Sequence, residues 1–131
     1  MKKARNEYLI PLAEKALREN SVILNGNTIL SAYNPKITSL GISIGMSGLR
    51  PSLAIFKNNE NRSEVDTIAI LDVIAKILHY DQECPYRNRI EDNDSLWKVA
   101  IHSDTDVRLL KRYVKEAAIA LKQVVRTYEL I

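Results

Sequence analysis

The chain has 131 residues, of which 46% are hydrophobic and 27% charged, and its formal net charge is +3 at pH 7. These values predict one globular domain over residues 1–131, and the net charge is too small to indicate nucleic-acid binding by itself. The only cysteine, Cys84, has no partner for an internal disulfide. Because residues 1–7 are polar and no long apolar run follows, we expect a cytoplasmic protein without a secretory signal or membrane span.

An amphipathic helix is predicted near the N-terminus, beginning at about Ala4 or Pro11 and ending near Asn20. Pro11 either begins the well-formed part of this helix or kinks it, because proline lacks a donor N–H and crowds the preceding turn. The apolar side of the helix would consist of Tyr8, Leu9, Leu12, Ala16 and Leu17.

The next segment, residues 20–27, is predicted to form a loop in which Asn25 and Gly26 mark a turn. The same spacing also suits a short β-hairpin with strands at residues 21–24 and 28–30. Both interpretations stay open on the evidence of the sequence.

The stretch from Tyr33 to Lys57 holds three of the four glycines and has two possible periodicities. From Leu40 to Met46, apolar residues alternate with glycine and serine, which predicts a half-buried strand. At a helical period, the same residues form an apolar ridge of Ile37, Leu40 and Ile44 beside a smooth face suited to close helix packing, made by Gly41, Gly45 and Gly48. Local propensity favours the strand, because each interior glycine costs a helix about 1 kcal/mol.

A well-buried helix is predicted at residues 67–80, where apolar side chains recur at helical spacing. Before it, Ser63 and Asp66 form an S-x-x-D pattern that is typical of a helix N-terminus. A charged connector follows at residues 81–94. After it, a short helix at residues 95–101 would cover the bundle.

The last predicted helix runs from about Thr105 to Tyr128, with aspartates at its N-terminus. Its apolar stripe would consist of Leu110, Val114, Ala117, Leu121, Val124, Val125 and Tyr128. The opposite side, a sector about 100° wide that only Ile119 interrupts, carries six basic residues, Arg108, Lys111, Arg112, Lys115, Lys122 and Arg126.

This basic row has two interpretations. It is the solvated outer face that any amphipathic helix needs, or it is a surface for a phosphate backbone, which flexible cations on a rigid helix neutralise without reading bases. The near absence of acids in the sector favours the second interpretation, since Glu116 lies beyond its edge. Lys2, Lys3 and Arg5 would extend the surface if the two ends of the chain lie close together.

The other chemically interesting side chains suit structural roles. Carboxylates in the connector and before the last helix fit helix caps, namely Asp92, Asp94, Asp104 and Asp106. His79 and His102 lie at predicted helix ends, where a cation favours the dipole, and Cys84 is expected to be an inert thiol. We therefore expect a protein that is not an enzyme, with no catalytic residue, no metal site and no cofactor.

Several segments together resemble one protein family. They are Tyr33, residues 37–41, residues 47–56, residues 114–121, and the upstream residues Arg5, Tyr8, Pro11 and Ala13. This pattern resembles the small subunit of the type III-B CRISPR effector, the Cmr complex. The resemblance implies that residues 33–57 form two helical pieces broken between Gly48 and Pro51. It thereby implies an all-α fold, a compact bundle of about five or six helices.

The resemblance also implies a function. Such a subunit is a non-catalytic structural component of an RNA-guided ribonucleoprotein in antiviral defence, in which several copies stack and contact the large subunit, the backbone subunits, guide RNA and target RNA. The alternative is a small helical regulator that binds duplex DNA through a recognition helix. Against it, the sequence shows no tight helix-turn-helix spacing and no cluster of Asn or Gln on the basic helix.

Overall fold

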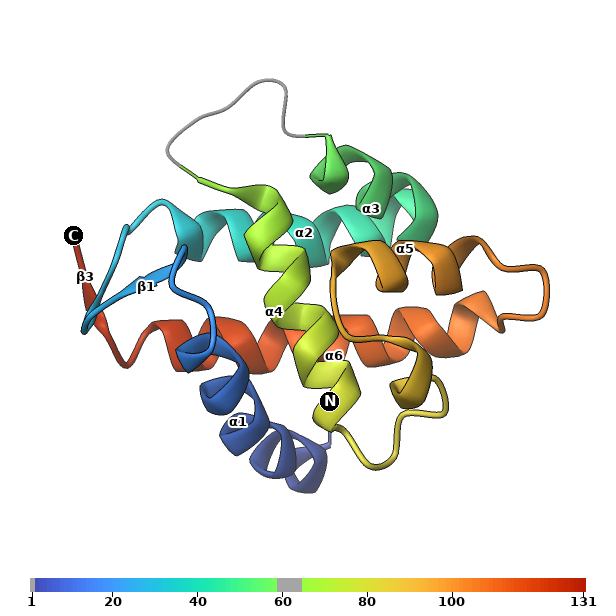
Figure 1. Cartoon of the computed structure of the whole chain (residues 1–131), viewed down its shortest axis with the longest axis horizontal. Coiled ribbons are helices and arrows are strands. Elements are labelled where there is room, and N and C mark those ends of the chain that lie inside the picture. The colour runs from blue at the N-terminus through green and yellow to red at the C-terminus, as the bar shows by residue number, and fades with distance from the viewer. Residues whose placement is uncertain (1, 59–64) are drawn as a thin grey trace.

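The structure, a computed structural model, describes residues 2–58 and 65–131. Within these ranges the chain forms six α-helices, a 3₁₀ turn and a sheet of three very short strands (Figure 1). Because 69% of the structure is helical and the sheet is so small, the predicted all-α bundle of about five or six helices is confirmed.

The first helix, α1 (Lys3–Arg18), continues through Pro11 without interruption. It therefore begins at the earlier of the two predicted positions. The missing N–H of Pro11 lies on the exposed side, while Leu9, Ala13, Ala16 and Leu17 are buried against α4 and α6. Burial of this stripe offsets the one backbone hydrogen bond that proline cannot make.

A short hairpin follows α1, as in the second interpretation, but its first strand shares only Leu24 with the predicted strand at residues 21–24, and residues 21–23 and 26–27 form turns, as the loop interpretation expected. Strand β1 (Leu24–Asn25) pairs antiparallel with β2 (Thr28–Ile29), and Gly26 adopts a φ of +64° at the first turn position. Positive φ at this position favours glycine in a two-residue hairpin turn. Before the hairpin, the amide oxygen of Asn20 accepts hydrogen bonds from the backbone N–H groups of Val22 and Ile23. These bonds stabilise the turn between α1 and β1.

A third strand, which is not apparent from the sequence pattern, comes from the C-terminus. Strand β3 (Glu129–Leu130) pairs parallel with β2, and the N–H of Ile131 donates to the carbonyl of Ile29 at 2.9 Å. The last helix consequently ends at Val125, three residues before the predicted end at Tyr128. The exposed apolar tail, Leu130 and Ile131, is held by backbone pairing within the chain.

The ambiguous glycine-rich stretch is helical. Helix α2 (Tyr33–Ser47) buries the ridge of Ile37, Leu40 and Ile44, and α3 (Leu49–Lys57) follows after the single residue Gly48. The predicted break between Gly48 and Pro51 is confirmed. Gly48 has φ 96° and ψ 167°, a conformation that is essentially restricted to glycine.

The glycine face of α2 does not pack as the helical periodicity suggested. Among the described residues, nothing lies within 4 Å of a Cβ placed on Gly41, and only the Nζ of Lys115 comes within 3.9 Å of one on Gly45. No helix of the described chain approaches this face closely. The reason is that α2 turns its aliphatic ridge, not its glycines, towards the core.

Two glycine substitutions with opposite expected effects test this description. Replacing Gly48 with alanine should lower the free energy of unfolding by about 1–3 kcal/mol, because a side chain is strained in this backbone conformation. Replacing Gly41 with alanine should raise it by up to about 1 kcal/mol, because alanine is the better helix former and the added methyl group meets no neighbour. Urea unfolding of both variants measures the effects. A Gly48→Ala variant as stable as the wild type would contradict the assigned conformation.

Helix α4 (Thr67–Tyr80) has the predicted bounds and runs across the bundle in front of α6 (Figure 1). Asp66 caps it, since its side chain accepts a hydrogen bond from the N–H of Ala69 at 3.0 Å. Ser63, the other half of the predicted capping pattern, lies outside the described residues. The buried side of α4 packs on α1, α3, α5 and α6, so this helix is central to the core.

The remaining elements are the 3₁₀ turn η1 (Arg87–Arg89), α5 (Asn93–Ile101) and α6 (Val107–Val125). Helix α6 packs against α1, α2 and α4 through one continuous buried stripe. This stripe consists of Leu110, Tyr113, Val114, Ala117, Ala118, Ala120, Leu121, Val124 and Val125. Its opposite side, which carries the basic row, remains at the surface.

Candidate nucleic-acid interface

A surface groove of about 940 Å³ lies between the N-terminal end of α1 and the outer side of α6. Six basic side chains line it, namely Lys2, Arg5, Arg108, Lys111, Arg112 and Lys115. Glu83, Tyr113, Glu116 and Ile119 complete the lining. The groove thus combines a predicted cationic helix face with residues from the start of the chain and from the connector after α4.

The structure divides the six predicted cations into two groups. Arg108, Lys111, Arg112 and Lys115 line the groove, whereas Lys122 and Arg126 lie further along α6 and outside it. Arg108, Arg112 and Arg126 are exposed and the three lysines are half-buried.

Among the described residues, none of the six forms an ion pair. Their charge is therefore not neutralised within this part of the chain. It remains available to an external anion.

The predicted contribution of the N-terminus is only partly correct. Lys2 and Arg5 reach the groove because the start of α1 packs beside the first half of α6, but Lys3 does not line it. The C-terminal tail lies instead against β2. The two ends of the chain therefore do not form one surface, and the groove depends on the N-terminal end alone.

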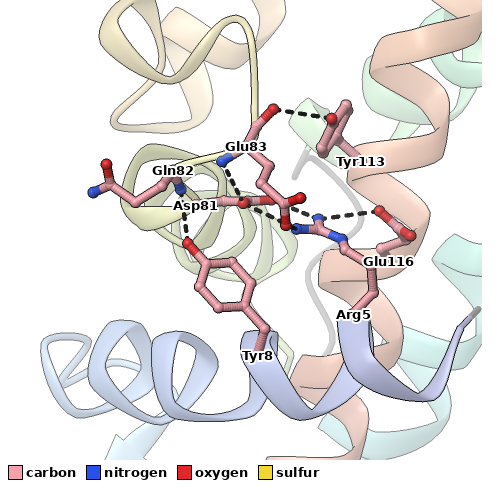
Figure 2. A network of polar contacts seen from close by, with 7 residues as sticks. All are labelled: Arg5, Tyr8, Asp81, Gln82, Glu83, Tyr113 and Glu116. Atoms are coloured by element: carbon pink, nitrogen blue, oxygen red, sulfur yellow. Dashed lines mark hydrogen bonds and ion pairs between the residues drawn. The ribbon is translucent and has the colours of Figure 1, made fainter.

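Arg5 is not a free cation, because three carboxylates surround it (Figure 2). Its Nη1 and Nη2 atoms bind the two oxygens of Asp81 at 3.1 and 2.6 Å. Nη1 also donates to Glu83 at 2.8 Å, and Nη2 donates to Glu116 at 3.1 Å. The guanidinium further lies over the rings of Tyr8 and Tyr113. We call Arg5, Asp81, Glu83 and Glu116 the Arg5 network.

The network joins three elements distant in sequence. Asp81 is the C-terminal cap of α4, its side chain is only 1% exposed, and a carboxylate at this end of a helix is disfavoured by the helix dipole. Arg5 compensates that charge, and the hydrogen bond with Asp81 is the main reason why the pKa of Arg5 is raised, against the opposing effect of burial. Glu116 connects the pair to α6.

The phenol groups of the two flanking tyrosines fix the connector after α4. The backbone N–H of Gln82 donates to the hydroxyl of Tyr8 at 2.9 Å, and the hydroxyl of Tyr113 donates to the carbonyl of Glu83 at the same distance (Figure 2). The connector is therefore held between α1 and α6. This arrangement brings Glu83 to the groove.

The other candidate residues have structural partners. Asp92 and Asp106 cap α5 and α6, and Asp94 lies in the first turn of α5 beside Lys57 and Lys98. Asp104 lies next to His102 at the end of α5. Over residues 2–58 and 65–131, no group of three potential ligand side chains is arranged to hold a metal ion.

His79 and Cys84 lie near each other in sequence but have separate environments. The Nδ1 atom of His79 is 2.8 Å from the carbonyl oxygen of Arg87, so this histidine ties α4 to the 3₁₀ turn. Cys84 is buried, and burial raises the pKa of its thiol above the usual value. A raised pKa reduces the thiolate fraction at neutral pH, as expected for an inert thiol.

Neither the Arg5 network nor the presence of two acids in the groove was predicted from the sequence. Arg5 and Asp81 are 76 positions apart, and no local periodicity connects them. The only sequence signal is that Arg5 and Tyr8 share a helix face at a spacing of three. That spacing does not identify a partner.

None of the helices in the described ranges is both long and apolar enough to cross a lipid bilayer. Comparisons with protein-family models, with curated proteins and with solved structures found no match to this chain.

Proposed function

We propose that this protein is a non-catalytic structural subunit of a type III-B CRISPR effector, an RNA-guided ribonucleoprotein that acts in the cytoplasm in antiviral defence. The observation that carries the proposal is the groove on α6, which is lined by a row of cations that form no ion pair with any other described residue. Sequence resemblance supplies the class of complex. The partners would be the large subunit, the backbone subunits, further copies of this chain, guide RNA and target RNA.

The basic row suits a phosphate backbone in both spacing and chemistry. Helix α6 has 19 residues, which corresponds to a rod of about 28 Å at 1.5 Å per residue. Cations distributed along such a rod can follow several consecutive phosphates without contacting base edges. RNA of any sequence would be bound, which is the requirement for a subunit that accompanies changing guides.

Exposed apolar residues on α2 support contacts with other protein subunits. Ile42 and Met46 are one turn apart and 57% and 84% exposed, and the open glycines of α2 lie beside them. Contiguous exposed apolar surface is typical of an interaction site. In the proposed complex this face would contact a neighbouring subunit, while α6 faces the RNA.

A tagged pull-down from the native host tests the assignment. Proteins are identified by mass spectrometry and copurified nucleic acid is sequenced. We expect CRISPR subunits together with short RNAs that carry repeat-derived ends. Recovery of the protein alone would contradict the proposal, and recovery with promoter DNA would support the DNA-binding regulator in its place.

A further inference from the structure

The Arg5 network carries more negative than positive charge at the wall of a cationic groove. Asp81 alone neutralises Arg5 through two hydrogen bonds, so Glu83 and Glu116 each add a charge that Arg5 cannot balance. Both acids line the groove together with the cations of α6. A phosphate chain that enters the groove therefore meets two carboxylates beside Arg5.

Glu83 and Glu116 differ in how firmly they are held. The side chain of Glu116 is 13% exposed, whereas that of Glu83 is 61% exposed. The backbone of Glu83 is fixed at both ends, since its N–H donates to Asp81 at 3.0 Å and its carbonyl accepts from Tyr113 at 2.9 Å. We therefore expect the carboxylate of Glu83 to leave Arg5 by rotation of its side chain alone.

We propose that Glu83 is an internal competitor that occupies, on the Nη1 atom of Arg5, the position taken by a phosphate oxygen when a polyanion fills the groove. This inference rests on the proposed function in one respect only, namely that the polyanion is RNA. Asp81 keeps Arg5 in place during the exchange, because its bidentate contact is largely buried and does not involve the carboxylate of Glu83. Arg5 becomes an additional phosphate ligand, and Glu83 lowers the affinity of the groove for phosphate chains.

The exchange is energetically accessible. The Arg5–Glu83 ion pair contributes little to stability, because its carboxylate is 61% exposed and screened by water, and because the Glu83 side chain loses freedom in the pair. A phosphate oxygen offers Arg5 an equally charged acceptor and at the same time approaches Lys2, Arg112 and Lys115. Removing Glu83 should therefore strengthen binding about three- to tenfold at low salt, the effect of one weak ion pair and one repulsive charge.

The test uses two probes with the full chain, inorganic polyphosphate and an RNA duplex, each titrated by fluorescence anisotropy competition at low and moderate salt. Glu83→Ala removes both the charge and the contact. Glu83→Asp keeps the charge but withdraws it from Arg5, and Glu91→Ala removes an equal, exposed charge outside the groove. We expect tighter polyphosphate binding by Glu83→Ala, a smaller gain by Glu83→Asp, and no change for Glu91→Ala.

The outcomes separate this inference from the proposed function. Equal or weaker polyphosphate binding by Glu83→Ala overturns the role of Glu83, even if the wild type binds RNA. If Glu83→Ala binds polyphosphate more tightly but Glu83→Asp does not, the effect is general repulsion between the carboxylate and the phosphates. That result also overturns the exchange with Arg5. Polyphosphate binding that responds to Glu83, without binding of RNA, supports the exchange and rejects the RNA-binding function. Absence of binding to either probe rejects both.

Discussion

Replacing Arg5 with methionine should lower the free energy of unfolding by about 3 kcal/mol, because it leaves the carboxylate of Asp81 buried without its partner. The side chain of Asp81 is 1% exposed and Arg5 supplies its bidentate contact. The network also fastens α1 to the end of α4 and, through Glu116, to α6. Urea unfolding followed by circular dichroism measures the loss.

Two further variants show whether the buried charge is the cause. Arg18→Met removes an arginine from an exposed pair with Glu14 on the same helix, and should cost less than about 0.5 kcal/mol. Adding Asp81→Asn to Arg5→Met should recover part of the loss, because the amide carries no charge to compensate. If Arg5→Met and Arg18→Met are equally mild, the Arg5 network does not hold the fold together.

Reversing two charges on α6, Arg112→Glu with Lys115→Glu, should weaken binding to an RNA duplex about 10- to 100-fold at low salt. Both residues line the groove and, among the described residues, neither forms an ion pair. The slope of log affinity against log salt should fall by about two, one for each lost phosphate contact. Stability should change little, because neither side chain contributes to the core.

The control is a double reversal that changes net charge equally, Arg89→Glu with Lys98→Glu, on exposed residues outside the groove. This variant should retain most of the wild-type affinity and salt slope. Fluorescence anisotropy at several salt concentrations compares the three proteins. Equal losses in both double variants would show that only overall charge matters, and unaltered RNA binding by the α6 variant would remove this face from the proposed function.

Features that depend on one helix were predictable from the sequence. The bounds of α4 follow from its apolar periodicity, and the basic row of α6 follows from positions that all face away from the buried stripe. The break at Gly48 has an equally local cause, since its backbone conformation suits glycine and Pro51 fits a new first turn. In each case the deciding interactions lie within one or two helical turns.

The structure of the glycine-rich stretch is not determined by local preferences. Alternation from Leu40 to Met46 favoured a strand, yet α2 is helical because Ile37, Leu40 and Ile44 together fill the core beside α6. Packing of that ridge outweighs the propensity cost of Gly41 and Gly45. Only the tertiary structure reveals that these glycines stay open to solvent.

The sequence by itself determined the helices with a clear apolar periodicity, such as α4 and α6, and the cationic side of α6. Tertiary structure alone decided that the C-terminal tail completes a sheet with the hairpin, that Arg5 is neutralised, and that Glu83 enters the groove. Each of these depends on contacts between residues more than 70 positions apart. Such contacts form because burial of the apolar faces of the helices brings the elements together. Which polar groups then come into contact cannot be predicted from the periodicity of any one segment.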